Sequence, residues 1–300
     1  MKDMIVVDGL VKSYGDVRAV DGVSFTVGEG EFFGLLGPNG AGKTTTLELV
    51  EGLRRPDAGT VSVAGLTPWP RNPALLPRMG VQLQASSFFE RLTAREQIRT
   101  FASLYGVPPG KADEMLAVVG LEEHAKVPAE KLSGGQAQRL SIACALVHEP
   151  DLVFLDEPTA ALDPQARRNL WDLLRQINTA GRTVVLTTHY MDEAELLCDR
   201  VAVIDGGRIL RTGAPAALVR DLDAPTRIGI ESGLLAADEA TRLFPADQVD
   251  DDGISLTITT RDAAHVLAGL AERNALRGLQ VRGATLEDVF LDLTGREYRA

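Results

Sequence analysis

The sequence predicts an α/β fold built on a largely parallel sheet, because apolar strand-like runs alternate with amphipathic helical segments. The runs lie at residues 152–155, 183–187 and 200–204, and helical patterns at 165–179 and 191–197 separate them. Such alternation indicates parallel strands with helices on the faces of the sheet. A glycine-rich segment between a strand-like run and a helical pattern, at residues 37–45, also favours this fold.

The elements before residue 150 are of two kinds. Short runs at residues 4–9, 23–27, 31–36 and 60–64 are bounded by Gly and Asp and predict strands. A helix is expected over residues 43–51, since Gly52 and Pro56 follow it. Residues 92–148 are mostly helical in pattern, with loops at 107–110 and 126–133. We therefore expect a helical subdomain over about residues 85–150 within the α/β core.

A second domain is expected after the linker-like LDAP at residues 222–225. From Asp223 onward the chain has no lysine, and its acidic residues outnumber the basic ones. The order of patterns there is strand, helix, strand, strand, helix, strand, helix. The predicted organisation is a main domain at residues 1–222 and a small α+β accessory or dimerisation domain, of ferredoxin-like type, at residues 223–300.

Charge and composition exclude several functions. A net charge of −11 argues against a general binder of nucleic acid or anionic membranes. No apolar run approaches the ~18 residues that span a bilayer, and the N-terminus has no signal-peptide pattern. Cys144 and Cys198 lack metal-ligand spacing and are expected to be buried thiols. We expect a cytoplasmic protein that reaches the inner face of the membrane only through a partner.

The segment GPNGAGKTT at residues 37–45 fits G-x-x-x-x-G-K-[ST]. Glycines let backbone N–H groups approach an anion closely, and the following helix adds its N-terminal N–H groups. The pattern predicts a phosphate-binding loop in which Lys43 neutralises the β- and γ-phosphates and Thr44 binds Mg²⁺. The residues expected to bind the nucleotide here are Gly37, Pro38, Asn39, Gly40, Ala41, Gly42, Lys43, Thr44 and Thr45.

Hydrolysis also needs a carboxylate for Mg²⁺ and a group that activates water. The apolar run LVFL at residues 152–155 leads into Asp156 and Glu157. A strand would carry both acids to the carboxyl edge of the sheet, where ligands bind in such folds. We expect Asp156 to bind Mg²⁺ and Glu157 to act as the general base.

The pentapeptide LSGGQ at residues 132–136 resembles the signature of the ATP-binding cassette (ABC) family, and Ser133 can cap the helix that begins near Gly135. The other family elements occur in order over residues 1 to about 220. The resemblance implies that Tyr14 stacks on adenine, that Asp163 lies at a dimer interface and that His189 contacts the γ-phosphate. It also implies that Gln84 contacts Mg²⁺ and the attacking water, although Gln82, two residues earlier, leaves the register open.

The resemblance implies a P-loop NTPase of ABC type, with a mixed sheet, an antiparallel β subdomain and a helical subdomain. In the family, Ser133, Gly134, Gly135 and Gln136 would bind ATP held by a second copy of the chain, so a homodimer is implied. Separately encoded transmembrane permease subunits would be the other partners. The tail at residues 284–297 resembles ATPases of daunorubicin-type exporters and implies export of a drug, lipid or polysaccharide. A soluble ABC ATPase acting in translation or DNA maintenance stays as the alternative.

Overall fold

The computed structural model describes residues 2–82 and 88–295 of the chain. The chain divides into two compact units, Met1–Pro215 and Ala216–Glu297. Each unit has its own sheet and its own apolar core. The units are therefore described one at a time.

The first unit is centred on a six-stranded sheet in the order β5-β6-β7-β3-β8-β9. The strands β3, β5, β6, β7 and β8 run parallel, and β9 forms an antiparallel hairpin with β8, so the sheet is mixed as expected. Strands β3, β6 and β7 are buried at every position, because the sheet is covered on both faces. The strands are β3 (Phe32–Leu36), β5 (Met79–Gln82), β6 (Leu152–Asp156), β7 (Thr183–Thr188), β8 (Arg200–Asp205) and β9 (Arg208–Gly213).

A separate antiparallel sheet has the order β2-β1-β4, with strands β1 (Asp3–Tyr14), β2 (Val17–Gly28) and β4 (Ala58–Val63). Strands β1 and β2 are twelve residues each, longer than the sequence pattern indicated. Gly9 and Gly22 have positive φ, and the register of the β1–β2 pair shifts near them. Residues that look like turns in the sequence are therefore bulges within continuous strands.

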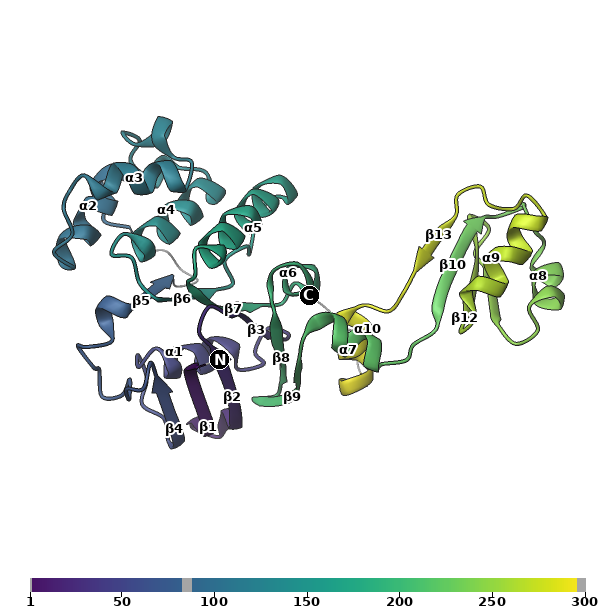
Figure 1. Ribbon diagram of the computed structural model, residues 1–300, viewed down its shortest axis with the longest axis horizontal. Coiled ribbons are helices and arrows are strands. Elements are labelled where there is room, and N and C mark those ends of the chain that lie inside the picture. The colour runs from purple at the N-terminus through teal and green to yellow at the C-terminus, as the bar shows by residue number, and fades with distance from the viewer. Residues whose placement is uncertain (1, 83–87, 296–300) are drawn as a thin grey trace. The chain divides into compact units, whose positions relative to one another are not determined.

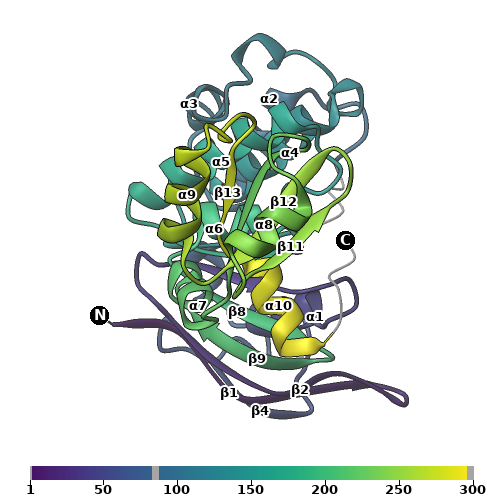
Figure 2. The ribbon, with the colours of Figure 1, turned by 90° about the vertical axis from the view of Figure 1, so that its right-hand side faces the viewer.

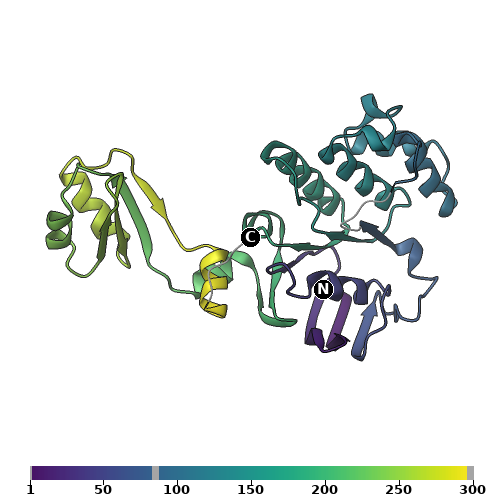
Figure 3. The ribbon, with the colours of Figure 1, turned by 180° about the vertical axis from the view of Figure 1, so that it is seen from behind.

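Helices complete the first unit. Figure 1 shows α2, α3 and α4 gathered at one end of the unit and the three-stranded sheet at the other, and Figure 3 shows the same arrangement from behind. The expected helical subdomain is thus present. The helices are α1 (Lys43–Val50), α2 (Ala94–Leu104), α3 (Lys111–Val118), α4 (Gly134–Leu146), α5 (Pro164–Thr179) and α6 (Met191–Leu197).

The second unit contains a four-stranded antiparallel sheet in the order β11-β12-β10-β13. Helices α8 and α9 lie against this sheet (Figure 2), and their apolar side chains form one core with Ile228, Ile230, Leu256 and Ile258. This is the split βαβ order of a ferredoxin-like domain. The elements are α7 (Pro215–Asp221), β10 (Thr226–Glu231), α8 (Ala237–Leu243), β11 (Gln248–Asp251), β12 (Ser255–Thr260), α9 (Ala263–Glu272), β13 (Gln280–Arg282) and α10 (Leu286–Thr294).

None of the helices in residues 2–82 and 88–295 has the length and apolar character needed to cross a membrane. Cys144 lies in α4 and Cys198 directly follows α6, and both thiols are buried and free, in agreement with the expectation for them.

Candidate functional site

The glycine-rich loop joins the buried strand β3 to helix α1, which begins at Lys43. Gly42 precedes the helix with φ of 100°, a conformation that side chains other than glycine rarely adopt. A Cβ atom on Gly42 would lie 2.2 Å from the Ala19 carbonyl oxygen, and one on Gly37 would lie 2.1 Å from the Ile204 carbonyl oxygen. The backbone therefore passes so close to its neighbours that only glycine fits at these two positions.

The loop surrounds a cavity of about 330 Å³. Lys43 is 4% exposed, and its Nζ donates to the carbonyl oxygens of Gly37 (2.7 Å) and Pro38 (3.1 Å). The same Nζ is 3.1 Å from Glu157 Oε1. Burial lowers the pKa of Lys43, and the charge of Glu157 opposes this effect. The residues that line the cavity are Ala19, Asn39, Gly40, Gly42, Lys43, Thr44, Thr45 and Glu157.

Asp156, at the end of β6, is held by two hydroxyl groups. Thr187 Oγ1 donates to Asp156 Oδ1 at 2.5 Å, and Thr44 Oγ1 donates to the same oxygen at 3.1 Å. Burial raises the pKa of Asp156, and these two hydrogen bonds oppose the rise. The contact between Thr44 and Asp156 brings together two of the three side chains that the sequence predicts at Mg²⁺, the third being Gln84.

Thr44 and Asp156 fit a magnesium ion chemically, because Mg²⁺ prefers oxygen ligands. Within residues 2–82 and 88–295 there is no cluster of three or more His, Cys, Asp or Glu side chains that could enclose a metal. The hydroxyl of Thr44 and the carboxylate of Asp156 suit Mg²⁺, which binds proteins through one or two side chains and keeps waters or substrate phosphates for its other positions.

Glu157 lies between a cation and a histidine. His189 Nδ1 is 3.1 Å from Glu157 Oε2, while Lys43 contacts the other carboxylate oxygen. The backbone N–H of Glu157 donates to Thr187 Oγ1 at 3.0 Å, and the residue has φ of 46°. The structure therefore brings together the predicted base, the histidine predicted to contact the γ-phosphate and the lysine of the loop.

The signature segment is built around the start of α4. Ser133 Oγ accepts from the Gln136 N–H, and Gln136 Oε1 accepts from the Ser133 N–H, so that the two residues form a capping box. The helix begins at Gly134, one residue earlier than expected. Ser133, Gly134, Gly135 and Gln136 are not among the residues that line the phosphate-loop cavity.

The remaining predicted residues are dispersed. Tyr14 ends β1 and is 41% exposed, and the cationic groups of Lys12 and Arg54 lie 5.7 and 5.6 Å from its ring centre. Asp163 caps α5 by accepting from the N–H groups of Gln165 and Ala166. Gln84 lies outside the described residues, whereas Gln82 is buried in β5.

Sequence reasoning missed two side chains that organise this site. Thr187 joins Asp156 to Glu157, but in the sequence it is a small residue at the end of an apolar run. His124 Nε2 is 2.8 Å from Gln136 Nε2. Because the two residues are 12 apart in the sequence, no local pattern predicts this contact. The sequence carries a signal for Thr187 alone, because it lies near the end of β7, two residues before His189.

The mixed sheet, the loop and the helix that follows it have the fold of a P-loop nucleotide-binding protein. The family described as "ABC transporter" matches residues 20–160, and the family described as "Nodulation factor export protein NodI, C-terminal domain" matches residues 235–295. A similar solved structure, titled as a dimeric post-hydrolysis state of an ATP-binding cassette bound to ADP and Pi, is 29% identical with a TM-score of 0.64. The match covers 70% of this chain and 98% of that one.

Two relatives match the chain over almost its whole length. "Nod factor export ATP-binding protein I" of Ralstonia nicotianae is 41% identical, over 99% of this chain and 95% of that protein. "Linearmycin resistance ATP-binding protein LnrL" of Bacillus subtilis is 38% identical, over 99% of this chain and 100% of that protein. The chain belongs to the family of ABC transporter ATP-binding subunits.

Proposed function

We propose that this chain hydrolyses ATP in the presence of Mg²⁺ and, as a homodimer, drives export through separately encoded membrane subunits. The observation that carries the proposal is the position of Glu157 between Lys43 and His189, beside the Thr44–Asp156 pair. A phosphate loop alone would only bind a nucleotide. An adjacent carboxylate, oriented by a histidine, can in addition activate water.

Each residue of the proposed site would have a separate role in ATP hydrolysis. Lys43 would exchange its contact with Glu157 for the phosphates, which leaves that carboxylate to accept a proton from the attacking water. The water oxygen bonds to the γ-phosphorus while the bond to the bridging oxygen breaks, and ADP and phosphate are the products. Thr44, Asp156 and Gln84 would hold Mg²⁺, whose charge offsets that of the phosphates. His189 would keep Glu157 in place.

The homodimer is supported by the position of the signature segment. The N-terminus of α4, with Ser133 at its cap, can bind an anion, yet its residues do not line the phosphate-loop cavity of the same chain. A second copy would bring this segment onto the nucleotide, with Asp163 at the contact between copies and Tyr14 against the adenine. Residues 1–222 would form the nucleotide-binding domain, and residues 223–300 would serve as an accessory or dimerisation domain.

Export is supported by the names of the relatives, which refer to Nod factor export and to linearmycin resistance. The alternative, a soluble ABC ATPase that acts in translation or DNA maintenance, has no support among these relatives. We place the working complex on the inner face of the cell membrane, where the ATPase subunits bind the membrane subunits.

The test is phosphate release by the full-length chain, purified with the membrane subunits encoded beside its gene and measured with and without Mg²⁺. We expect Mg²⁺-dependent release that Lys43→Ala abolishes. A complex that forms but releases no phosphate above the Lys43→Ala background would refute hydrolysis. A chain that binds no membrane subunit would refute the transport role.

A further inference from the structure

The orientation of the His189 imidazole decides whether it reaches Glu157. Its Nδ1 lies 3.1 Å from Glu157 Oε2. His189 follows strand β7 and precedes helix α6, so it belongs to neither element. A histidine side chain in such a link can turn about two bonds, and each turn changes its distance to the carboxylate. Neighbouring side chains must therefore fix the ring if it is to hold Glu157.

The next residue along the chain supplies one such neighbour. The ring centres of Tyr190 and His189 lie 4.1 Å apart, and the two ring planes are tilted by 40°. Aromatic rings in contact attract each other and favour particular relative orientations. The backbone of Tyr190 is also fixed, since its N–H donates to Thr188 Oγ1 at 2.9 Å. The Tyr190 ring therefore limits the rotation of the imidazole.

The presence of a tyrosine at this position is not explained by the helix that follows. Tyr190 holds the N-cap position of α6, where Ser, Thr, Asp and Asn are the stabilising residues. Its side chain makes no capping hydrogen bond. Residues that break a local preference in this way are typical of functional sites. The contact between its ring and His189 offers such a function.

A cation in turn holds the Tyr190 ring. The guanidinium carbon of Arg167 lies 4.0 Å from the centre of this ring, within the range of a cation–π contact. Arg167 Nε is buried and has no hydrogen-bond partner among the residues that the structure describes. Contact with the aromatic ring is therefore the interaction that the structure shows for this part of the side chain.

Helix α5 carries Arg167 on a face that is fixed against α6. Trp171, one turn further along α5, donates from Nε1 to Glu193 Oε1 at 3.1 Å. Residues four apart lie on the same face of a helix, so Arg167 and Trp171 both face the segment that starts at Tyr190. Glu193 is fully buried, and its contact with Trp171 joins the two helices. The cation that holds the Tyr190 ring therefore has a rigid support.

We propose that Tyr190, held by Arg167, is a positioning residue that keeps the His189 imidazole against the carboxylate of Glu157. The inference rests on the proposed function, since it adds a residue to the same hydrolytic site. Tyr190 acts through His189 and takes no part in the transfer of the phosphoryl group. Its loss should therefore affect the rate of the chemical step more than the binding of ATP, which depends on Lys43 and the phosphate loop.

The first test measures kcat and KM for phosphate release by the full-length chain with its membrane subunits. We expect Tyr190→Ala to lower kcat about 10- to 100-fold, the scale for a misplaced catalytic group, and to change the KM for ATP less than about threefold. Alanine, like this tyrosine, makes no capping hydrogen bond, so the start of α6 should lose little stability. Tyr190→Phe retains the ring and should keep kcat within about twofold of wild type.

Arg167 and its neighbour in the sequence provide a matched pair of variants. We expect Arg167→Gln to lower kcat about three- to tenfold, because the Tyr190 ring loses the cation that holds it. Arg168→Gln is the control on the same helix, since Arg168 is exposed, and it should change kcat less than about twofold. Thermal melting of each variant checks its fold.

A double-mutant cycle separates the positioning of His189 from a general structural role. In a chain that already carries His189→Ala, the addition of Tyr190→Ala should change the remaining kcat less than about twofold, because no imidazole is left to position. A structural role would lower kcat equally in both backgrounds. The two roles therefore predict different results for the same pair of variants.

The ring resonances of His189 report the same contact without any measurement of activity. The chain has four histidines, and His189→Ala assigns the His189 signal in an NMR spectrum of the imidazole C–H groups. We expect Tyr190→Ala to move this signal, because an aromatic ring shifts the resonances of a group in contact with it. Tyr190→Phe should move the signal little, and Arg168→Gln should leave it in place.

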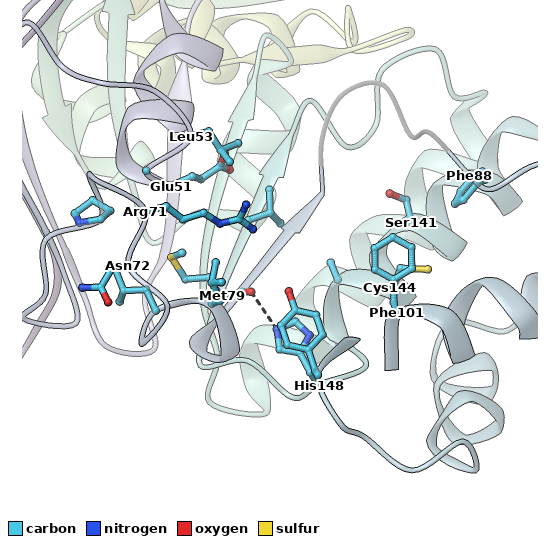
Figure 4. A pocket seen from close by; sticks show the side chains of 17 residues that line it. Glu51, Leu53, Arg71, Asn72, Met79, Phe88, Phe101, Ser141, Cys144 and His148 are labelled. Carbon is cyan, nitrogen blue, oxygen red and sulfur yellow. Dashed lines mark hydrogen bonds between the residues drawn. The ribbon is translucent and has the colours of Figure 1, made fainter. Parts of the chain in front are cut away.

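The matched control for the spectrum is a second tyrosine–histidine pair in the first unit. The rings of Tyr105 and His148 are stacked with their centres 3.8 Å apart, and both residues line a separate cavity of about 340 Å³. Figure 4 shows His148 in this cavity, with its hydrogen bond to the Met79 carbonyl oxygen and with the buried Glu51 on the opposite side. We expect Tyr105→Ala to move the His148 signal and to leave that of His189 unchanged.

Three results would overturn the inference and leave the proposed function standing. They are wild-type kcat in Tyr190→Ala, equal losses in the two backgrounds of the cycle, and a His189 signal that Tyr190→Ala does not move. If His189→Ala releases no measurable phosphate, the His189 signal decides in place of the cycle. A wild-type complex that forms but releases no phosphate would refute the proposed function itself.

Discussion

His189 Nδ1 lies 3.1 Å from Glu157 Oε2, so the imidazole holds one oxygen of a carboxylate whose other oxygen contacts Lys43. Both oxygens of the proposed base are thus engaged in the chain by itself. A nucleotide that takes over Lys43 would release one of them while His189 retains the other. The base would become available only once ATP is bound.

Glu157→Gln should separate binding from hydrolysis. The amide keeps the shape of the side chain but cannot accept the proton of the attacking water, so we expect turnover to fall by about 10²- to 10⁴-fold. ATP binding, measured by equilibrium titration with a labelled nucleotide, should persist because Lys43 and the loop are intact. Near-normal phosphate release by this variant would rule out Glu157 as the base.

Thr187→Val tests the hydroxyl group that joins the two acids. We expect at least about tenfold slower turnover and a higher Mg²⁺ requirement, because Asp156 and the Glu157 N–H each lose a hydrogen bond. Thr183→Val is the matched control on the same strand, where the hydroxyl accepts from the Gly30 N–H. Both variants should lose about 1–3 kcal/mol of stability in denaturant titrations, but only Thr187→Val should lose activity. Equal activity losses would indicate a general effect of destabilisation.

Ser133→Ala tests the signature cap against a second capping box on another helix. Thr93 caps α2 through the same kind of capping box, with Glu96 as its partner. Each Ala variant should lose about 0.5–2 kcal/mol of stability. We expect only Ser133→Ala to lower ATP turnover, and to lower it more at limiting ATP, in a phosphate-release assay. Similar kinetics for the two variants would contradict a role of Ser133 in binding.

Glu51 should make the stability of the isolated chain depend on pH. Its pKa is about 8 in the folded chain against an ordinary value of 4.5, so the unfolded chain loses the proton first as pH rises. The protonated Glu51 carboxyl therefore makes its full contribution to the free energy of unfolding below pH 4.5. This contribution is lost by about pH 8. We expect Glu51→Gln to gain stability over wild type by roughly 2 kcal/mol or more between pH 5 and pH 8 in denaturant titrations. A constant difference across this range would refute the burial argument.

Much of the fold could be predicted from the sequence, because the periodicity of apolar residues is local. The helix after Lys43, the strand before Asp156 and the order of elements after residue 223 are confirmed. The lengths of β1 and β2 could not be predicted, because glycines such as Gly9 and Gly22 are as typical of a turn that ends a strand as of a bulge within one. Telling the two apart needs the partner strand.

The environment of Glu51 lies beyond sequence reasoning for a related reason. An acidic residue just past the end of a helix ordinarily faces solvent, and nothing nearby in the chain signals otherwise. It is buried, and it lines a cavity with residues as distant in the sequence as Pro68, Met79 and Cys144. Local patterns therefore predicted the side chains of the phosphate loop, whereas side chains buried by distant contacts needed the folded structure.

The pairing of β6 with β7 sets Asp156 opposite Thr187. Thr188, the next residue, points to the other face of the sheet, where its hydroxyl accepts from the Tyr190 N–H. Inserting one residue into β7 ahead of Leu186 would set Leu186 opposite Asp156 and turn Thr187 to the other face of the sheet. We expect such an insertion to remove the hydrogen bond from Thr187 to Asp156 in the proposed site, so the spacing between Thr183 and His189 limits insertion and deletion in this strand.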